Sequence, residues 1–266
     1  MKLLSKSKET SKVALDKSKK FFTGGSVISK LVMTVLFIIL FIVVINIIKR
    51  AYRKYNELAF SSPWIFKGTK DAKTRMVILQ DPSKYGAITL PRSKNEYGGL
   101  ETSYMLWIHI DNWNHNANKM KHILHKGNSS GEPLQAPGIW LHADKNSLRI
   151  NMNTYKHVTE FVDVDNIPLN KWVHITVAVR QRNMDVFING NLSKRLKLEA
   201  LPKQNYGDIY INAFGGFGGF ISNIRYFNHY ISFKEIDDHM SDGPSSKSCV
   251  DSGEKPPYFV PNWWIS

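Results

Sequence analysis

The fold is decided by residues 168–192, which read PLNKWVHITVAVRQRNMDVFINGNL. From 172 to 179, β-branched side chains occupy every second position, the period that puts them on one face of a β-strand. A second alternating stretch, 184–188, ends at the dipeptide Asn189-Gly190. This dipeptide favours a type I′ turn, because both of its residues tolerate the positive φ that such a turn requires. The sequence therefore predicts a β-hairpin.

Short alternating segments continue on both sides of this hairpin, and turn residues separate them. They cover residues 104–110, 192–198, 209–211 and 220–227. In the first of them, one face carries Tyr104, Leu106, Ile108 and Ile110. No long amphipathic helix is expected between residues 71 and 233, which favours an all-β domain of two antiparallel sheets packed face to face.

The hairpin resembles the central hairpin of laminin G-like jelly rolls in the concanavalin A-like lectin/glucanase superfamily. These domains typically show a Leu-Asn-x-Trp start, a histidine on the strand and an Asn-Gly turn, here Leu169 to Trp172, His174 and Asn189-Gly190. The segments that resemble the neighbouring strands of the family follow in the family's order: 100–113, 122–127, 138–154 and 218–236. The resemblance implies a two-sheet antiparallel jelly-roll sandwich over residues 71–240.

An uncharged run, LVMTVLFIILFIVVINII, covers residues 31–48. As a helix it would be about 27 Å long, close to the ~30 Å of a hydrocarbon core, and residues 27–30 can complete the span. Basic residues follow the run where a signal peptide would have a small-residue cleavage site, so we expect one transmembrane helix over 27–48. Lysines and arginines flank both ends, which leaves the orientation open.

The remaining segments complete the expected organisation: a basic tail at 1–26, a juxtamembrane linker at 49–70 and a tail rich in proline and aromatic residues at 241–266. Of the net charge of +14, residues 1–60 contribute +9, with 12 basic and 3 acidic side chains. The basic tail 1–26 is expected to attract anionic lipid head groups. Binding of nucleic acid is expected only through this tail. The single cysteine, Cys249, excludes an intramolecular disulfide.

Glucanases of this superfamily use two carboxylates spaced as Glu-x-Asp-x-x-Glu on one strand. The nearest match, residues 235–239, reads EIDDH and lacks the second glutamate. We interpret it as a polar helical turn after the last strand, and we do not predict an enzyme.

Metal binding is also not expected. His122 and His125 are three positions apart on a predicted strand, so they should point to opposite faces and share no ion. Asp111 and the asparagine-rich stretch 112–118 form a weak calcium candidate, since calcium prefers several carboxylates. The alternative for this stretch is a loop whose side-chain amides close turns.

A sugar-binding site needs exposed aromatic rings, and the candidates are Trp113, Trp140 and Tyr155. The glycine-rich stretch 214–220 is expected to permit a tight start of the following strand. The C-terminal tail carries four large aromatic candidates for docking: Tyr258, Phe259, Trp263 and Trp264. It is expected to fold back onto its own sandwich or to dock into a neighbouring protein.

These features together predict a noncatalytic single-pass membrane protein whose jelly roll attaches to a protein partner. Its layout is similar to that of virion membrane proteins of large double-stranded DNA viruses, in which such a protein could link the inner membrane to capsid proteins. The alternative is a membrane-anchored lectin that binds a glycan.

Overall fold

The computed structural model describes residues 27–96 and 99–247 of the 266-residue chain. The chain divides into two compact units, Met1–Leu58 and Ala59–Ser266. The predicted basic tail 1–26 and the aromatic residues of the C-terminal tail lie outside the described residues.

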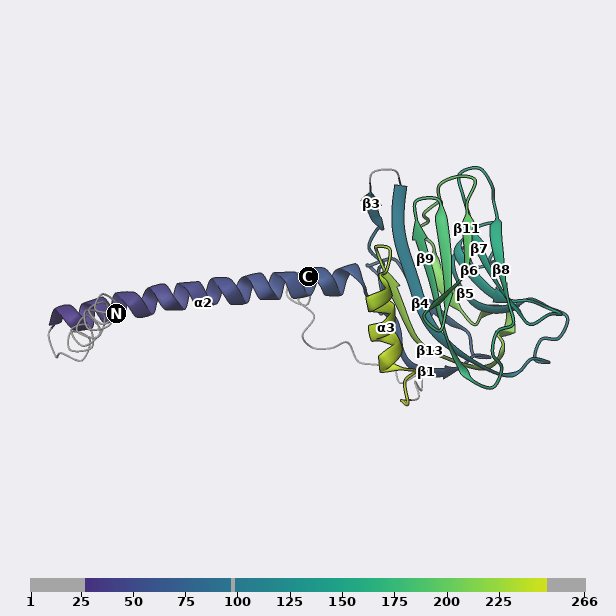
Figure 1. Cartoon of the computed structure of the whole chain (residues 1–266), viewed down its shortest axis with the longest axis horizontal. Coiled ribbons are helices and arrows are strands. Elements are labelled where there is room, and N and C mark those ends of the chain that lie inside the picture. The colour runs from purple at the N-terminus through teal and green to yellow at the C-terminus, as the bar shows by residue number, and fades with distance from the viewer. Residues whose placement is uncertain (1–26, 97–98, 248–266) are drawn as a thin grey trace, which may run out of the picture. The chain divides into compact units, whose positions relative to one another are not determined.

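The first described element is one helix, α2 (Val27–Ser61), of 35 residues (Figure 1). Part of it, Val27–Asn56, is long and apolar enough to cross a membrane, and its most apolar 18-residue window has a mean hydropathy of 3.2. The helix continues well beyond the predicted end at Ile48. Neither proline nor glycine interrupts residues 27–61, and Pro63 is the first residue that must break the helix.

The structure therefore differs from the prediction that residues 49–70 form a linker. The first part of this segment is helical, and its end contains strand β1 (Trp64–Asp71), which pairs antiparallel with the last strand of the jelly roll. Ile65 and Phe66 are buried in the hydrophobic core. Irregular register in this strand hid the alternation, because two shifts occur between Trp64 and Thr69.

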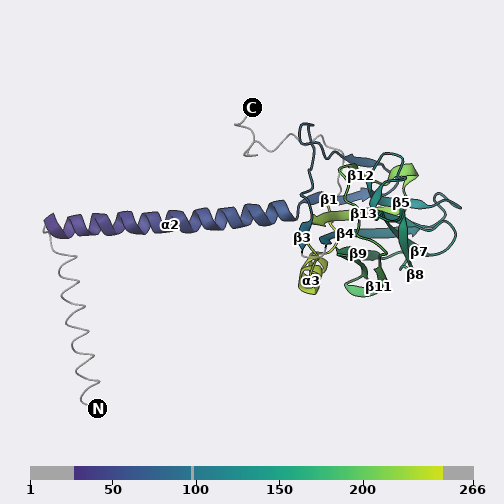
Figure 2. The same ribbon diagram turned by 90° about the horizontal axis from the view of Figure 1, so that it is seen from above.

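Two antiparallel sheets confirm the predicted sandwich (Figures 1 and 2). The seven-stranded sheet runs in the order β1-β13-β4-β9-β10-β11, with β3 paired to β4. Its further strands are β3 (Lys94–Glu96), β4 (Gly99–Asn112), β9 (Trp172–Arg180), β10 (Asn183–Ile188), β11 (Asn191–Lys197) and β13 (Gly218–Phe227).

The six-stranded sheet runs in the order β2-β12-β5-β6-β7-β8. Its strands are β2 (Met76–Ile78), β5 (Lys121–Gly127), β6 (Gln135–Leu141), β7 (Ser147–Met152), β8 (Glu160–Asp165) and β12 (Asp208–Ile211). A 3₁₀ turn, η1 (Ala213–Gly215), connects β12 to β13.

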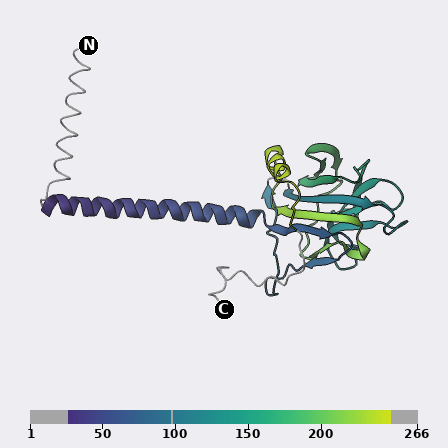
Figure 3. The same ribbon diagram turned by 90° about the horizontal axis from the view of Figure 1, so that it is seen from below.

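The predicted hairpin joins β10 to β11, and its turn has φ of 49° at Asn189 and 77° at Gly190. The core lies between the sheets, and every apolar face predicted for residues 104–110 and 173–179 points into it. The helix α3 (Phe233–Asp242) follows β13 and lies outside the seven-stranded sheet (Figure 3). It buries a second, smaller apolar cluster that includes Met105, Phe227 and Ile236.

Residues 235–239 belong to α3, which confirms the predicted helical turn. Glu235 accepts hydrogen bonds from the backbone N–H and the hydroxyl of Ser232, and the backbone N–H of Glu235 donates to the Ser232 hydroxyl. This reciprocal arrangement is a capping box, which satisfies N–H groups at the first turn of a helix.

One buried carboxylate ties the last hairpin to the segment before α3. Asp185 on β10 is 1% exposed along its side chain and accepts two hydrogen bonds from Arg195 on β11, at 2.6 and 2.7 Å. The hydroxyl of Tyr230 donates to the same carboxylate at 2.6 Å. Burial raises the pKa of Asp185, but these hydrogen bonds outweigh burial and hold the pKa below its usual value.

We therefore expect Arg195→Ala to lower the free energy of unfolding by about 1–2 kcal/mol, because a buried carboxylate loses a charged partner. Chemical denaturation of the detergent-solubilised chain measures this loss. Lys194→Ala changes the exposed neighbour on the same strand and should stay within about 0.5 kcal/mol of wild type. Equal effects of the two substitutions would contradict the structural role of the Asp185 cluster.

Candidate functional site

A hollow of about 550 Å³ opens on the outer face of the six-stranded sheet. We call it the outer hollow. Strands β6, β7 and β8, the turn η1 and the segment between β5 and β6 contribute its walls. The lining residues are Met120, Ser130, Glu132, Gln135, Trp140, Arg149, Asn151, Thr159, Phe161 and Phe214.

Three aromatic rings give the outer hollow its apolar surface. Trp140 on β6 stacks against Phe214 of η1, with ring centroids 5.8 Å apart and planes 17° apart. Phe214 is 52% exposed and Phe161 on β8 is 50% exposed. Single exposed rings are common on folded domains, but several that lie together form an apolar patch of the kind that marks a contact surface.

Polar side chains of neighbouring strands lie between these rings. Arg149 donates two hydrogen bonds of 2.8 Å to Asp163, and its guanidinium lies 4.1 Å from the ring centre of Phe161. These contacts use two of the five N–H groups of Arg149. The side-chain oxygen of Gln135 accepts from the indole N–H of Trp140 and from Asn151. The indole of Trp140 is thus fixed in orientation.

The loop predicted as a calcium candidate helps to hold η1. The side-chain amide of Asn116 donates to the carbonyl of Gly216 at 3.1 Å, and a ring nitrogen of His115 contacts the carbonyl of Gly215 at 2.7 Å. Asn112 accepts from the backbone N–H of Asn114 at 3.0 Å. The asparagine side chains therefore close turns, as the alternative interpretation of this stretch predicts.

A buried pair of histidines lies behind Trp140 and Phe214. The Nε2 atom of His122 and the Nδ1 atom of His125 are 2.6 Å apart, and neither residue is exposed. The prediction that these residues point to opposite faces is wrong. The pairing register of β5 shifts between His122 and Leu124, so one extra residue restores both imidazoles to the same face.

The partners of the pair determine where its protons lie. The backbone N–H of Ala213 donates to Nδ1 of His122, which therefore carries no proton. The proton of His122 is on Nε2 and is donated to Nδ1 of His125. The Nε2 atom of His125 then donates to the carbonyl of Asn128. Both rings are neutral in this chain of hydrogen bonds.

Burial favours the same state. It holds the pKa of His122 well below the ordinary 6.5, and the neighbouring His125 lowers it further. Burial also lowers the pKa of His125, and Arg75 acts in the same direction, whereas the hydrogen bond to Asn128 opposes them. The aromatic wall of the outer hollow therefore rests on uncharged imidazoles.

The structure does not bring the three sequence-predicted ligand residues together. Trp140 lines the outer hollow. Trp113 packs against the hydrophobic core, and the Lys121 ammonium lies 4.9 Å from its ring centre. Tyr155 is 73% exposed in the loop between β7 and β8 and does not line the outer hollow.

Asp111 is exposed at the end of β4. Within residues 27–96 and 99–247, no three His, Cys, Asp or Glu side chains lie close enough together to hold a metal ion. Tyr258, Phe259, Trp263 and Trp264 lie outside the described residues.

Sequence reasoning missed Phe161, Phe214 and Arg149. Phe214 is the first residue of the predicted glycine-rich stretch 214–220 but was not singled out as a ligand contact, and its φ of 55° places it in the left-handed region. The alternation of β7 and β8 could have placed Arg149 and Phe161 on the outer face. It could not have shown that η1 brings a ring from residue 214 beside them.

We expect NMR to find both His122 and His125 neutral and protonated on Nε2 at pH 7. Well above pH 6.5 both rings are neutral in the folded and in the unfolded chain. At lower pH the two histidines bind protons in the unfolded chain but stay neutral in the folded chain. The free energy of unfolding should therefore fall as the pH falls. Denaturation series at pH 7 and pH 5.5 measure this fall, and His125→Gln should reduce it. An imidazolium at either position at pH 7 would contradict this assignment.

No curated protein matches the sequence. Among solved structures, the binding domain of botulinum neurotoxin DC in complex with rat synaptotagmin II is 18% identical with a TM-score of 0.43, and the match covers 53% of this chain and 35% of that chain. The receptor-binding domain of the botulinum neurotoxin C/D mosaic serotype is 15% identical with a TM-score of 0.45, over 54% and 36% of the two chains. The match therefore spans about a third of the length of these structures.

The sequence profile of one family, a laminin G-like group described as the concanavalin A-like lectin/glucanases superfamily, matches residues 82–237. This match covers more than half of the chain and almost the whole sandwich. The chain belongs to the concanavalin A-like lectin/glucanases superfamily.

Proposed function

We propose that this protein is a membrane-anchored binding protein whose outer hollow takes up sugar rings of a glycan. The observation that carries the proposal is the combination of half-exposed aromatic rings with hydrogen-bonding side chains in one open hollow. The apolar C–H face of a sugar ring can pack on an aromatic ring, and its hydroxyl groups both donate and accept hydrogen bonds.

The groups left unsatisfied in the outer hollow suit such a ligand. Three N–H groups of Arg149 remain available for sugar oxygens, since Asp163 uses two. Glu132 and Thr159 are exposed at the rim and can accept from sugar hydroxyls. The hollow is open at the surface, which favours part of a longer glycan over an enclosed small molecule.

The chemistry of the lining favours binding over hydrolysis. Glycosidases that follow the two-carboxylate mechanism place two carboxyl groups across the scissile bond. Glu132 is the one carboxylate among the lining residues that the structure describes. Asp163, beside the hollow, is engaged by Arg149, whose hydrogen bonds lower its pKa.

The helix α2 supplies the proposed attachment to a bilayer. Its uncharged run 31–48 has the length of a hydrocarbon core, and the side chains at 49, 50, 53 and 54 add a basic cluster directly after it. In this arrangement the anchor attaches the jelly-roll domain to a bilayer.

Attachment to a protein is the second candidate, and one observation favours it. The outer face of the seven-stranded sheet carries a row of rings that are not part of the cluster buried by α3. The ring centre of His109 lies 5.5 Å from that of Trp172 and 6.3 Å from that of Phe220, and Phe220 is 42% exposed. A protein that covers this row would bury apolar area. In a virus particle, capsid proteins would be such partners for a protein of the inner membrane.

We expect the detergent-solubilised chain to bind specific structures on a glycan array. Phe161→Ala should weaken this binding about five- to tenfold, because it removes one stacking ring worth about 1 kcal/mol. Tyr155→Ala removes an exposed aromatic ring outside the outer hollow and should bind as wild type does. No binding to any glycan, or equal affinities for Phe161→Ala and wild type, would contradict the proposal.

Calcium is tested in the same assay. Since the lining contributes a single carboxylate, Glu132, we expect glycan binding to persist in EDTA. Loss of binding that calcium restores would instead support the weak candidate at Asp111.

We expect wild-type protein to stay in the membrane fraction after alkaline carbonate extraction. Replacement of Ile38 and Ile42 by lysine should release most of it, because each central lysine costs about 2.5–3.5 kcal/mol on insertion. Tyr55→Lys lies outside the uncharged run and should leave membrane association unchanged. Release of the wild-type protein by carbonate would argue against an anchor.

A further inference from the structure

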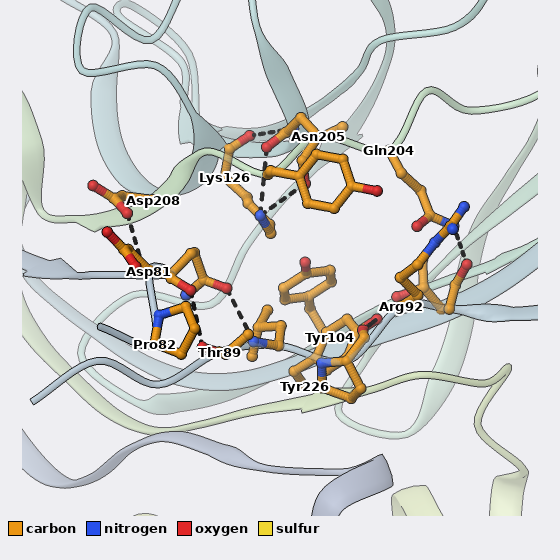
Figure 4. A pocket seen from close by; sticks show the side chains of 17 residues that line it. Asp81, Pro82, Thr89, Arg92, Tyr104, Lys126, Gln204, Asn205, Asp208 and Tyr226 are labelled. Carbon is orange, nitrogen blue, oxygen red and sulfur yellow. Dashed lines mark hydrogen bonds between the residues drawn. The ribbon is translucent and has the colours of Figure 1, made fainter. Parts of the chain in front are cut away.

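A second cavity, of about 440 Å³, lies at one end of the sandwich, away from the outer hollow. We call it the tyrosine cavity. The segments 80–93 and 204–208 form its sides, and Tyr104 of β4 and Tyr226 of β13 lie at its floor (Figure 4). The two tyrosine rings are 5.1 Å apart in an edge-to-face arrangement, and each residue is less than 5% exposed.

The hydroxyl of Tyr104 points into this cavity (Figure 4). Other buried polar groups of the cavity have protein partners: the Tyr226 hydroxyl donates to the carbonyl of Pro91, and the Lys126 ammonium donates to the carbonyls of Asn205 and Gly207. Tyr104 is 3% exposed as a residue, and in the part of the chain that the structure describes its hydroxyl makes no hydrogen bond to protein but faces the open space of the cavity. Burial raises its pKa well above the usual value, so it remains a donor. A donor that faces an open cavity can be used by a ligand that enters the cavity and displaces water from it.

The surroundings of this hydroxyl specify the chemistry of the ligand. Pro82, Pro91 and the 80% exposed Tyr206 give the cavity flat apolar walls. Arg92 and Gln204 add donors at the rim (Figure 4). A polyproline II segment fits such a site, because its backbone carbonyls are free acceptors, its prolines have no N–H to satisfy and its rings pack on aromatic side chains.

The chain itself carries a segment of this kind. Residues 255–261 read KPPYFVP. The last described residue, Lys247, is held at strand β1 by a hydrogen bond of 2.8 Å from the N–H of Thr69 to its carbonyl. Eight residues lie between Lys247 and Pro256, and the nine steps from one to the other can span about 30 Å when extended. A domain of this size has a radius of gyration of about 17 Å, so the segment can reach the cavity from this point.

We propose that the proline-rich segment 255–261 of the same chain docks into the tyrosine cavity, with a backbone carbonyl accepting the hydrogen bond of Tyr104. Docking would bury the aromatic residues next to the prolines and give the Tyr104 hydroxyl a protein acceptor. It does not depend on glycan binding, because the tyrosine cavity and the outer hollow share no lining residue.

Hydrogen–deuterium exchange on the detergent-solubilised protein tests the docking. We expect residues 80–93 to exchange at least about threefold faster after deletion of 255–266 than in the full chain. A synthetic peptide of residues 253–266 should restore the protection, whereas the same peptide with Pro256→Ala and Pro257→Ala should not. Equal exchange of the full and shortened chains would overturn the proposal, as would equal protection by the two peptides.

Tyr104→Phe tests the hydrogen bond. In the shortened chain this substitution should leave the melting temperature unchanged, since the hydroxyl has no partner among the described residues, yet it should weaken peptide binding about fivefold. Phe161→Ala, in the outer hollow, should bind the peptide as wild type does. Unchanged peptide affinity in Tyr104→Phe would overturn the assigned contact.

A photo-crosslinker at position 258 identifies the source of the segment. In a mixture of isotopically heavy and light full-length chains, crosslinks to residues 80–93 or 204–208 within one chain support the proposal. Crosslinks between heavy and light chains, or to neither segment, would overturn it.

Discussion

The pairing of β4 with β9 constrains the rest of the structure. Leu106 lies opposite Ile175 and Ile108 opposite Val173, and all four side chains are fully buried between the sheets. Because side chains alternate along a strand, a slip of one residue would turn this whole set toward solvent. The register that buries these residues also fixes which residues face outward, and so it places Met105 and Ala178 beneath α3.

The six-stranded sheet departs from this alternation at one point, and the outer hollow is built there. Ile123 and Leu124 both enter the core, so β5 contains one residue more than its partner requires. The extra residue brings His122 and His125 to the same outer face. His122 can then bind the N–H of Ala213 and hold η1 against the sheet, which sets Phe214 beside Trp140. A bulge in one strand thus creates a wall made of residues far apart in the sequence.

The sequence predicts what depends on local periodicity. The hairpin at Asn189-Gly190, the inward face of β4 and the helical turn at 235–239 all follow from spacing and from turn or capping residues. Strand β1 was not predicted, because its register shifts twice and breaks the alternation of side chains. The end of α2 was placed too early, because the loss of apolar residues marks the end of a lipid-spanning stretch and not the end of the helix. The outer hollow was found only through Trp140. Its other rings come from β8 and η1, and tertiary contacts that no local pattern encodes bring them together.

The conformation of Phe214 connects the fold with the proposed function. A bulky residue with φ of 55° is strained, at a cost of about 1–3 kcal/mol, and its half-exposed ring recovers little of this by burial. The strain is offset nearby: Ala213 donates to His122, the backbone N–H of Asn212 donates to the carbonyl of Ile123, and Asn116 holds Gly216. These bonds keep an aromatic ring at the surface, although relaxation of η1 would be favourable without them. The half-exposed ring of Phe214 adds nothing to the packing of the core, so core stability does not explain why the fold holds it there. Its place beside two other rings is useful to a ligand that stacks on it.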